Sequence, residues 1–146
     1  MVTIANIYFS DLERTTIIEL PILPTEMPDL SRSARNEEFE TFGDGTFNLL
    51  GSMGLFTFTL DSFLPAFAGK YRWAKSQINP YVLINLWHSN MSNKTPIRVI
   101  MDRGERKDLP SELLNLAVSV ESMNWHEDRT GDVKYTVNFK EYRSIR

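Results

Sequence analysis

Residue types that could carry catalysis are sparse in this sequence, and their spacing does not assemble a reaction centre. The two histidines, His88 and His126, are far apart in the chain. Neither lies in a spacing such as H-x-x-x-H, which places two metal ligands on one helix face. Glu37 and Glu38 are adjacent, so on a strand they point to opposite faces and cannot act as a carboxylate pair.

The remaining polar motifs are typical of turns. Asp128 and Asp132 flank a glycine-containing turn, where aspartate is favoured for its hydrogen bonds to the backbone. Gly43-Asp44-Gly45 is too short to cradle a phosphate, and no G-x-S-x-G, P-loop or G-x-G-x-x-G is present. The absence of cysteine excludes a disulfide, a thiolate nucleophile and a Cys-based zinc site. We therefore predict no enzymatic activity, no cofactor and no metal site.

The sequence also gives little support for a nucleic-acid-binding or sugar-binding protein. The chain is acidic, with a net charge of −3, and its basic residues do not interleave with aromatics along a strand. Three tryptophans could stack on sugar rings. We expect Trp87 to belong to the core stripe of a helix and Trp125 to end a core strand, which leaves Trp73, in a loop, as the candidate for carbohydrate binding.

The charge is unevenly divided along the chain. Residues 1–69 carry three basic and ten acidic side chains, a net charge of −7, whereas residues 70–146 carry thirteen and nine, a net charge of +4. Such a split can let copies of the chain meet through opposite charges. Alternatively, the two halves interleave in one fold and the contrast averages out.

Length and composition indicate one folded domain over residues 1–146. The chain is 42% hydrophobic and 24% charged, as in ordinary globular proteins. No apolar run approaches the ~20 residues that cross a bilayer, and the first residues lack the pattern of a signal peptide. We expect a cytoplasmic or intracellularly assembled protein without membrane association.

Alternating hydrophobicity predicts a mainly β fold with one helix. The clearest strand closes the chain, where Val133, Tyr135, Val137 and Phe139 share one face. Asn79 as cap and Pro80 at the first position predict a helix over about residues 80–89, with Leu83, Leu86, Trp87 and Met91 as its apolar stripe. Further strands are expected over residues 4–10, 15–22, 55–60, 96–101 and 116–125. The fold class is α+β, mainly β: a curved antiparallel sheet or small barrel packed with one helix.

A hairpin over about residues 31–51 is unusual because its first arm cannot anchor a core. Its glycine-rich turn is Gly43-Asp44-Gly45. One face of the arm is Arg32, Ala34, Asn36, Glu38 and Glu40, and the other is Ser31, Ser33, Arg35, Glu37, Phe39 and Thr41. Such a hairpin is either a floppy surface loop or a strand pair that finds its partners on another chain.

Four stretches together resemble a known family. They are DSFLPAF, NPYVLINLW, TPIRVIMDRG and, most specifically, TGDVKYTVNFKEYRSI. From about Ile17 to Ile145 the chain resembles the N-terminal module of LysM-carrying tail proteins, which occur in contractile bacteriophage tails and phage-tail-like particles. The resemblance does not extend to a LysM domain, so we do not transfer peptidoglycan binding; that module is encoded separately, is lost, or lies outside this piece of chain.

The resemblance implies a structural protein of the baseplate hub. It implies a tail-tube-like β-barrel or sandwich with a flanking helix, six copies of which form a ring joining the inner tube to the spike complex. The hairpin would then pair between subunits and line a channel through Arg32, Arg35, Glu37, Glu38, Glu40 and Asp44. Acidic residues predominate in this set, so the wall would let DNA pass without binding it. The expected location is a virion or phage-tail-like particle assembled in the bacterial cytoplasm.

Two other readings remain open at this stage. One is a monomeric β module that binds cell-wall carbohydrate through Trp73, or another protein. The other is a cell-wall hydrolase, which requires two carboxylates roughly 5–9.5 Å apart across a cleft. The sequence offers no such pair.

Overall fold

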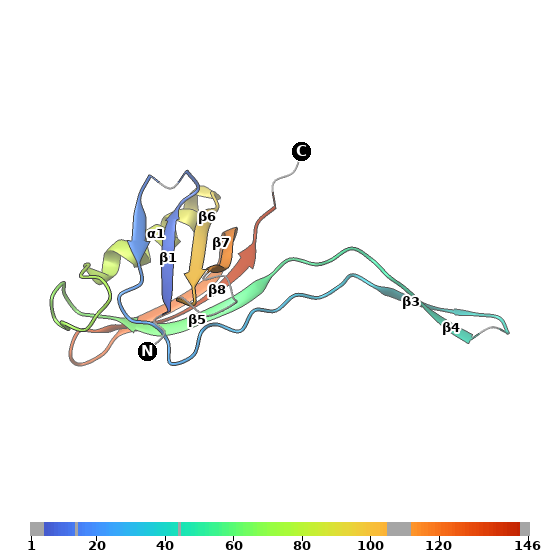
Figure 1. Ribbon diagram of the computed structural model, residues 1–146, viewed down its shortest axis with the longest axis horizontal. Helices are drawn as coiled ribbons and strands as arrows, with labels where there is room; N and C mark the ends of the chain where they lie inside the picture. Colours follow the sequence, from blue (N-terminus) through green and yellow to red (C-terminus); the bar gives the residue numbers. More distant parts are fainter. Residues whose placement is uncertain (1–4, 14, 44, 105–111, 144–146) are drawn as a thin grey trace.

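The fold is built from eight strands and one helix within the residues that the computed structural model describes, 5–13, 15–43, 45–104 and 112–143. Figure 1 shows a body of strands and helix from which a long arm projects. In chain order the elements are β1 (Asn6–Asp11), β2 (Ile17–Glu19), β3 (Glu37–Thr41), β4 (Gly45–Leu49), β5 (Thr57–Leu64), α1 (Pro80–Asn93), β6 (Ile97–Asp102), β7 (Glu112–Glu127) and β8 (Val133–Glu141).

The body is one antiparallel sheet of six strands in the order β2-β1-β6-β7-β8-β5, while within the described residues β3 and β4 pair with each other and with no other strand. Between the described residues, no pairing joins β2 to β5 at the two ends of this order, so the sheet does not close into a barrel. The predicted α+β, mainly β class is confirmed. Of the two architectures that the sequence left open, the structure has the curved open sheet.

Strand β7 is the corner at which the sheet bends. Its first part pairs with β6 as far as Val118, and from Val118 onward it pairs with β8. A register shift between Val120 and Ser122 marks a bulge, a feature that bends a strand and increases its twist. In Figure 1, β1 and β6 accordingly run in a different direction from β5 and β8. The bend turns one face of the sheet inward around a core.

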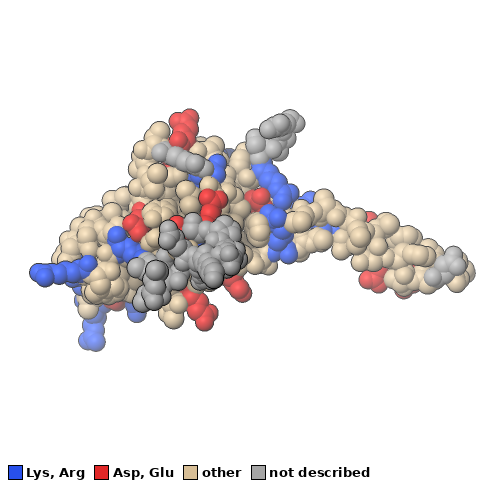
Figure 2. Space-filling view, in the orientation of Figure 1, with Lys and Arg blue, Asp and Glu red and all other residues tan. Residues whose placement is uncertain are grey.

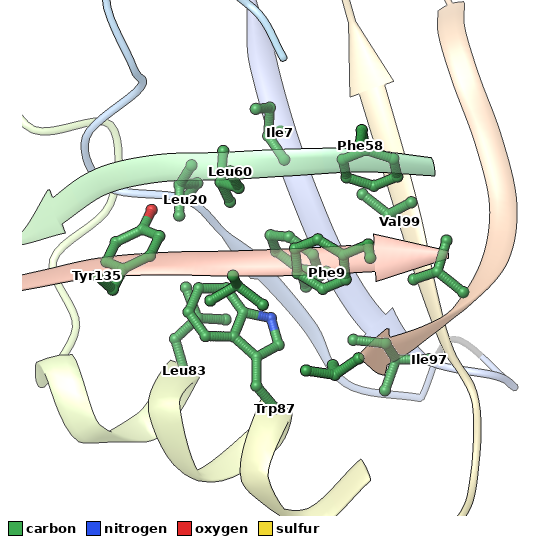
Figure 3. Packing of buried hydrophobic residues seen from close by; sticks show 14 of the residues in the cluster. Ile7, Phe9, Leu20, Phe58, Leu60, Leu83, Trp87, Ile97, Val99 and Tyr135 are labelled. Atoms are coloured by element: carbon green, nitrogen blue, oxygen red, sulfur yellow. The ribbon is translucent and has the colours of Figure 1, made fainter. Parts of the chain in front are cut away.

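The core lies between the two parts of the bent sheet and α1. Phe9 of β1 stacks on Phe139 of β8, with ring centroids 5.5 Å apart, although β1 and β8 are not neighbours in the sheet. Trp87 of α1 meets Phe9 edge-on at 5.3 Å and Tyr135 at 5.1 Å (Figure 3). The alternation predicted for the last strand is confirmed, because its four inward residues are all buried: Val133, Tyr135, Val137 and Phe139.

The helix begins where the sequence predicts and runs four residues further, to Asn93. The Asn79 side chain accepts a hydrogen bond from the Tyr81 N–H, and Pro80 follows the cap. Asn90 extends the inward face, because its buried amide oxygen accepts the Val120 N–H at 3.0 Å, next to the bulge of β7. Lys94, in the left-handed conformation, ends the helix.

Several sequence expectations are corrected. Met91 is exposed rather than part of the apolar stripe, and Trp125 is 41% exposed because β7 continues past the core. His126 lies in β7. The strand expected over residues 15–22 is shorter: β2 covers Ile17–Glu19, and the Leu20 N–H still donates to Ile7 O of β1 at 2.8 Å. In the strand expected over residues 4–10, Ile4 lies outside the described residues, and the strand begins at Asn6.

Candidate functional site: the protruding hairpin

The hairpin is an arm that extends away from the body (Figure 1). Every described position of β3 and β4 is exposed except Thr41, which is half-buried. No described residue between 31 and 55 belongs to the hydrophobic core. The predicted turn is confirmed in its geometry, since Gly43 and Gly45 have φ of 91° and 87°, which favour glycine. Asp44 lies outside the described residues.

The hairpin has one apolar face and one polar face. Opposite residues in an antiparallel pair share a face, and Phe39 is opposite Phe47 while Glu37 is opposite Leu49. The two phenylalanine rings stack with centroids 5.7 Å apart, yet they remain 41% and 46% exposed. The polar face holds Glu38 and Glu40 with their partners, Asn48 and Thr46.

The two faces separate the acidic residues of the hairpin, which the sequence analysis assigned together to the channel lining. Glu38 and Glu40 lie on the polar face, as their spacing predicts, whereas Glu37 borders the apolar face. The two faces of the first arm do not by themselves show the apolar face, because the return arm supplies most of it. There, Phe47 and Leu49 complete an apolar stripe with Phe39, and their alternation was the signal that could have revealed it.

The arms stay paired between the strands and the body, with two irregularities in the return arm. Isolated bridges join Ser31 to Thr57 and Ala34 to Met53. The spacing between successive pairs differs in the two arms. Between the two bridges, and again between the second bridge and the Glu37–Leu49 pair, the return arm is one residue longer than the outgoing arm. Each of the two longer segments of the return arm contains a glycine. A Cβ on Gly51 would lie 1.7 Å from the Arg35 carbonyl oxygen, and one on Gly54 would lie 2.6 Å from that of Ser33, so neither position has room for a side chain.

Of the two arginines expected to line a channel, one belongs to the root of the hairpin instead. Arg32 donates to Glu141 at 2.9 Å, and its guanidinium lies 3.6 Å from the centroid of the Phe56 ring. The Arg32 side chain is only 26% exposed, which removes it from the projecting surface. Arg35 is exposed on the arm, and its backbone N–H donates to Ser52 O.

Glu141 is the centre of this root. Its carboxylate accepts the Phe56 N–H at 3.0 Å, Arg32 Nη2 at 2.9 Å and Arg143 Nε at 3.3 Å. Burial by itself raises the pKa of Glu141, but the Phe56 N–H and the two guanidinium groups together hold this pKa below its ordinary value. The glutamate of the KEYR motif thus fastens the hairpin to the last strand of the sheet.

We predict that Glu141→Gln loosens this root. A neutral amide cannot pair with two guanidinium groups, and solvent access to Arg32 and Arg143 limits the expected loss to about 1 kcal/mol of unfolding free energy. The folded state lowers the pKa of Glu141, so its stabilisation is present above the ordinary pKa of 4.5 and is lost as the pH falls through the lowered value.

Urea unfolding between pH 3 and pH 7 measures this effect. The parent chain should lose its advantage over Glu141→Gln as the pH falls through that window. Lys140→Gln, on the exposed face of the same strand, is the matched control and should change little. A constant difference between parent and Glu141→Gln across the whole pH range would contradict the assignment.

Asp132, the aspartate of the TGDV motif, fastens the opposite end of the body. It is buried and accepts the Ala66 N–H at 2.9 Å, Lys70 Nζ at 2.7 Å and the Tyr71 hydroxyl at 2.7 Å. Burial raises the pKa of Asp132, but Lys70 and Tyr71 reverse the effect and lower it. The sequence predicts a turn-forming role for both aspartates of this turn; Asp128 has that role, whereas Asp132 holds a distant loop.

The remaining candidates for chemistry do not converge. His88 is exposed on α1, Trp87 is fully buried in the core and Trp73 is 66% exposed. The described residues hold no group of three or more metal-ligating side chains. Among those same residues, no helix has the length and apolar character needed to span a membrane.

The fold has a counterpart among solved structures. The chain is similar to a chain in the cryo-EM structure of the anti-feeding prophage (AFP) baseplate, 6-fold symmetrised, with a TM-score of 0.54 and 9% sequence identity. The match covers 100% of this chain and 93% of that one. No protein-family model matches the sequence, and no curated protein matches it. The similarity extends over the whole chain and shows a shared fold.

Proposed function

We propose that this chain is a non-enzymatic structural subunit of the baseplate of a contractile phage tail or phage-tail-like particle. The observation that carries the proposal is the hairpin itself. Its strands have no other strand partner among the described residues, and Phe39, Phe47 and Leu49 are exposed to solvent. Exposed apolar surface of this kind marks an interface. The shared fold with a chain of the AFP baseplate supports a tail-associated role.

The proposed assembly is a ring in which each hairpin lies between two neighbours. The outer edges of β3 and β4 have no strand partner among the described residues, so each can pair with a hairpin from the next copy. A contact that repeats around an axis closes a ring. Six copies is the stoichiometry we propose, by analogy with the six-fold symmetrised structure that shares the fold.

In the proposed ring, the polar face of the hairpin lies toward the channel and the apolar face lies against neighbouring subunits. Burial of the apolar stripe against neighbouring subunits gains the hydrophobic free energy that the isolated chain lacks, about 25 cal/mol per Å² of apolar surface. The face with Glu38 and Glu40 would then line a water-filled channel. An acidic wall repels DNA, which suits a conduit at the junction of tube and spike. This refines the channel-lining set to Glu38 and Glu40.

Removal of the apolar stripe tests the proposal. We expect Phe39→Ser combined with Phe47→Ser to prevent ring formation without lowering the melting temperature, because neither ring packs on the core. Thr46→Ser combined with Asn48→Ser changes the polar face of the same hairpin and should leave assembly intact. Negative-stain electron microscopy and sedimentation of particles or purified rings provide the measurement. Rings that form normally from the double phenylalanine variant would overturn the proposal.

A monomeric carbohydrate-binding module is the second candidate, and one observation favours it. Trp73 is 66% exposed, and its ring centroid lies 5.1 Å from that of Tyr71, so two aromatic rings are presented together. This candidate predicts that peptidoglycan fragments shift the Trp73 fluorescence and that Trp73→Ala abolishes the shift. The ring proposal predicts no shift.

A further inference from the structure

An aromatic surface lies at the end of the body opposite the hairpin. We call it the loop surface and define it by Phe67, Tyr71, Arg72 and Trp73, from the segment between β5 and α1, and by Arg129 of the β7–β8 turn. Figure 1 shows this segment and this turn at one extreme of the long axis and the hairpin at the other. Phe67 is 58% exposed and Trp73 is 66% exposed.

The loop surface is held in place from beneath. Besides the three bonds to Asp132, the Gly69 N–H donates to Gln77 Oε1 at 2.7 Å, and Gln77 Nε2 donates to Tyr71 O at 2.8 Å. The Lys75 N–H donates to Pro21 O at 2.8 Å, which joins the segment to the residues that follow β2. Because these bonds fix the loop, its aromatic groups are presented to solvent without the entropy cost of ordering them on binding.

The charge of the loop surface is positive. Lys70 is neutralised by Asp132, whereas Arg72 and Arg129 are exposed and form no ion pair with a described residue. In the adjoining turn, Asp128 accepts a hydrogen bond from the Thr130 hydroxyl and Glu127 accepts one from the Tyr81 hydroxyl; these neutral partners orient the two carboxylates and leave them charged. Figure 2 shows Lys and Arg atoms at this end of the molecule and Asp and Glu atoms on the distal hairpin.

The hairpin presents the complementary surface. Glu38 and Glu40 are exposed without an ion pair among the described residues, and Phe42, next to the turn, is fully exposed. Each end of the molecule therefore combines unburied apolar groups with unpaired charge, and the two charges have opposite sign. The two ends lie too far apart along the molecule to meet within one chain (Figure 1).

We infer that the loop surface binds the distal hairpin of a second copy of this chain. Such a contact is heterologous, so it joins copies head to tail and can repeat from one copy to the next. It covers Glu38 and Glu40, so a hairpin bound in this way does not line the channel, and the contact belongs to chains outside the assembled ring. It leaves the backbone edges of β3 and β4 free. The inference thus goes beyond the proposed ring, which depends on those edges.

The absence of native cysteine allows a direct cross-linking test on the full chain. Ala68→Cys marks the loop surface, Thr46→Cys marks the distal hairpin, and all three positions used, including Ser89 on α1, are exposed. Under mild oxidation we expect a mixture of Ala68→Cys and Thr46→Cys chains to yield mixed disulfide dimers at least tenfold faster than a mixture of Ala68→Cys and Ser89→Cys. Equal rates in the two mixtures would overturn the inference.

Charge reversal identifies the groups that make the contact. Arg72→Glu with Arg129→Glu in the Ala68→Cys chain should remove the rate advantage. Glu38→Lys with Glu40→Lys in the Thr46→Cys chain should restore it, because the reversed charges again attract. Failure of this restoration would overturn the electrostatic match.

The ring and the head-to-tail contact can fail independently of each other. Rings that form without the mixed cross-link overturn the head-to-tail contact alone, whereas the cross-link without rings overturns the ring proposal alone. If peptidoglycan fragments block the loop surface and shift Trp73 emission while no cross-link forms, the occupant is a carbohydrate and the inference is wrong.

Discussion

Replacing Trp87 with alanine is expected to lower the free energy of unfolding by about 3–5 kcal/mol, the range for a large aromatic side chain removed from a packed core. Trp87 is fully buried and contacts aromatic rings from two parts of the sheet, Phe9 of β1 and Tyr135 of β8, as well as Phe139 at 6.0 Å. Its loss leaves a cavity where the helix joins the bent sheet (Figure 3).

Chemical denaturation followed by far-UV circular dichroism measures this loss. Trp73→Ala is the matched control, because it removes the same side chain from an exposed position and should cost far less. Trp87→Phe should recover part of the stability by refilling some of the volume. A cost below about 1 kcal/mol for Trp87→Ala would mean that the helix does not seal the core as described.

Excision of the hairpin, unlike the loss of Trp87, is expected to preserve the stability of the fold and to abolish assembly. If residues 37–49 are replaced by a short Gly/Ser turn, no core residue is removed, since none of the described residues in that range belongs to the core. The root pair between Arg32 and Glu141 stays in place. The melting temperature should therefore change by no more than a few degrees.

The functional effect of the same excision should be complete. Without β3 and β4 the chain has neither the exposed apolar stripe nor the free strand edges that the ring requires. We expect the excised protein to remain monomeric and to be absent from purified particles, as measured by sedimentation velocity and by immunoblotting of particle fractions. Incorporation at the parent level would contradict the role assigned to the hairpin. Unfolding of the excised protein would instead show that the arm belongs to the core.

Local patterns predicted much of the fold. The period-two alternation of the last strand, the Asn79-Pro80 helix start and the glycine-rich hairpin turn all depend on residues close together in the chain, and each is confirmed. The end of the helix was missed because Asn90 is a polar residue whose partner, Val120, is supplied by a distant strand. Periodicity alone could not indicate that a buried asparagine belongs to the inward face.

The sequence predicted the protruding hairpin but not the contacts that fasten it to the body. An arm without core residues can be recognised from composition, and the hairpin projects as that composition indicates. The roles of Glu141 and Asp132 could not be predicted, because their partners Arg32 and Lys70 lie 109 and 62 positions away. Arg32 was assigned to the channel for the same reason: its charge is visible in the sequence, and its burial against Phe56 is not.

The role of the hairpin in the baseplate can be seen directly in a cryo-EM reconstruction of the particle that carries this protein, focused where the tube meets the spike. We expect a six-fold ring of this chain in which β3 and β4 of each copy, residues 37–49, reach the channel, with Glu38 and Glu40 facing the lumen and Phe39 and Phe47 covered by neighbours. Density for this chain at the particle periphery, or a ring with its hairpins pointing away from the channel, would contradict it.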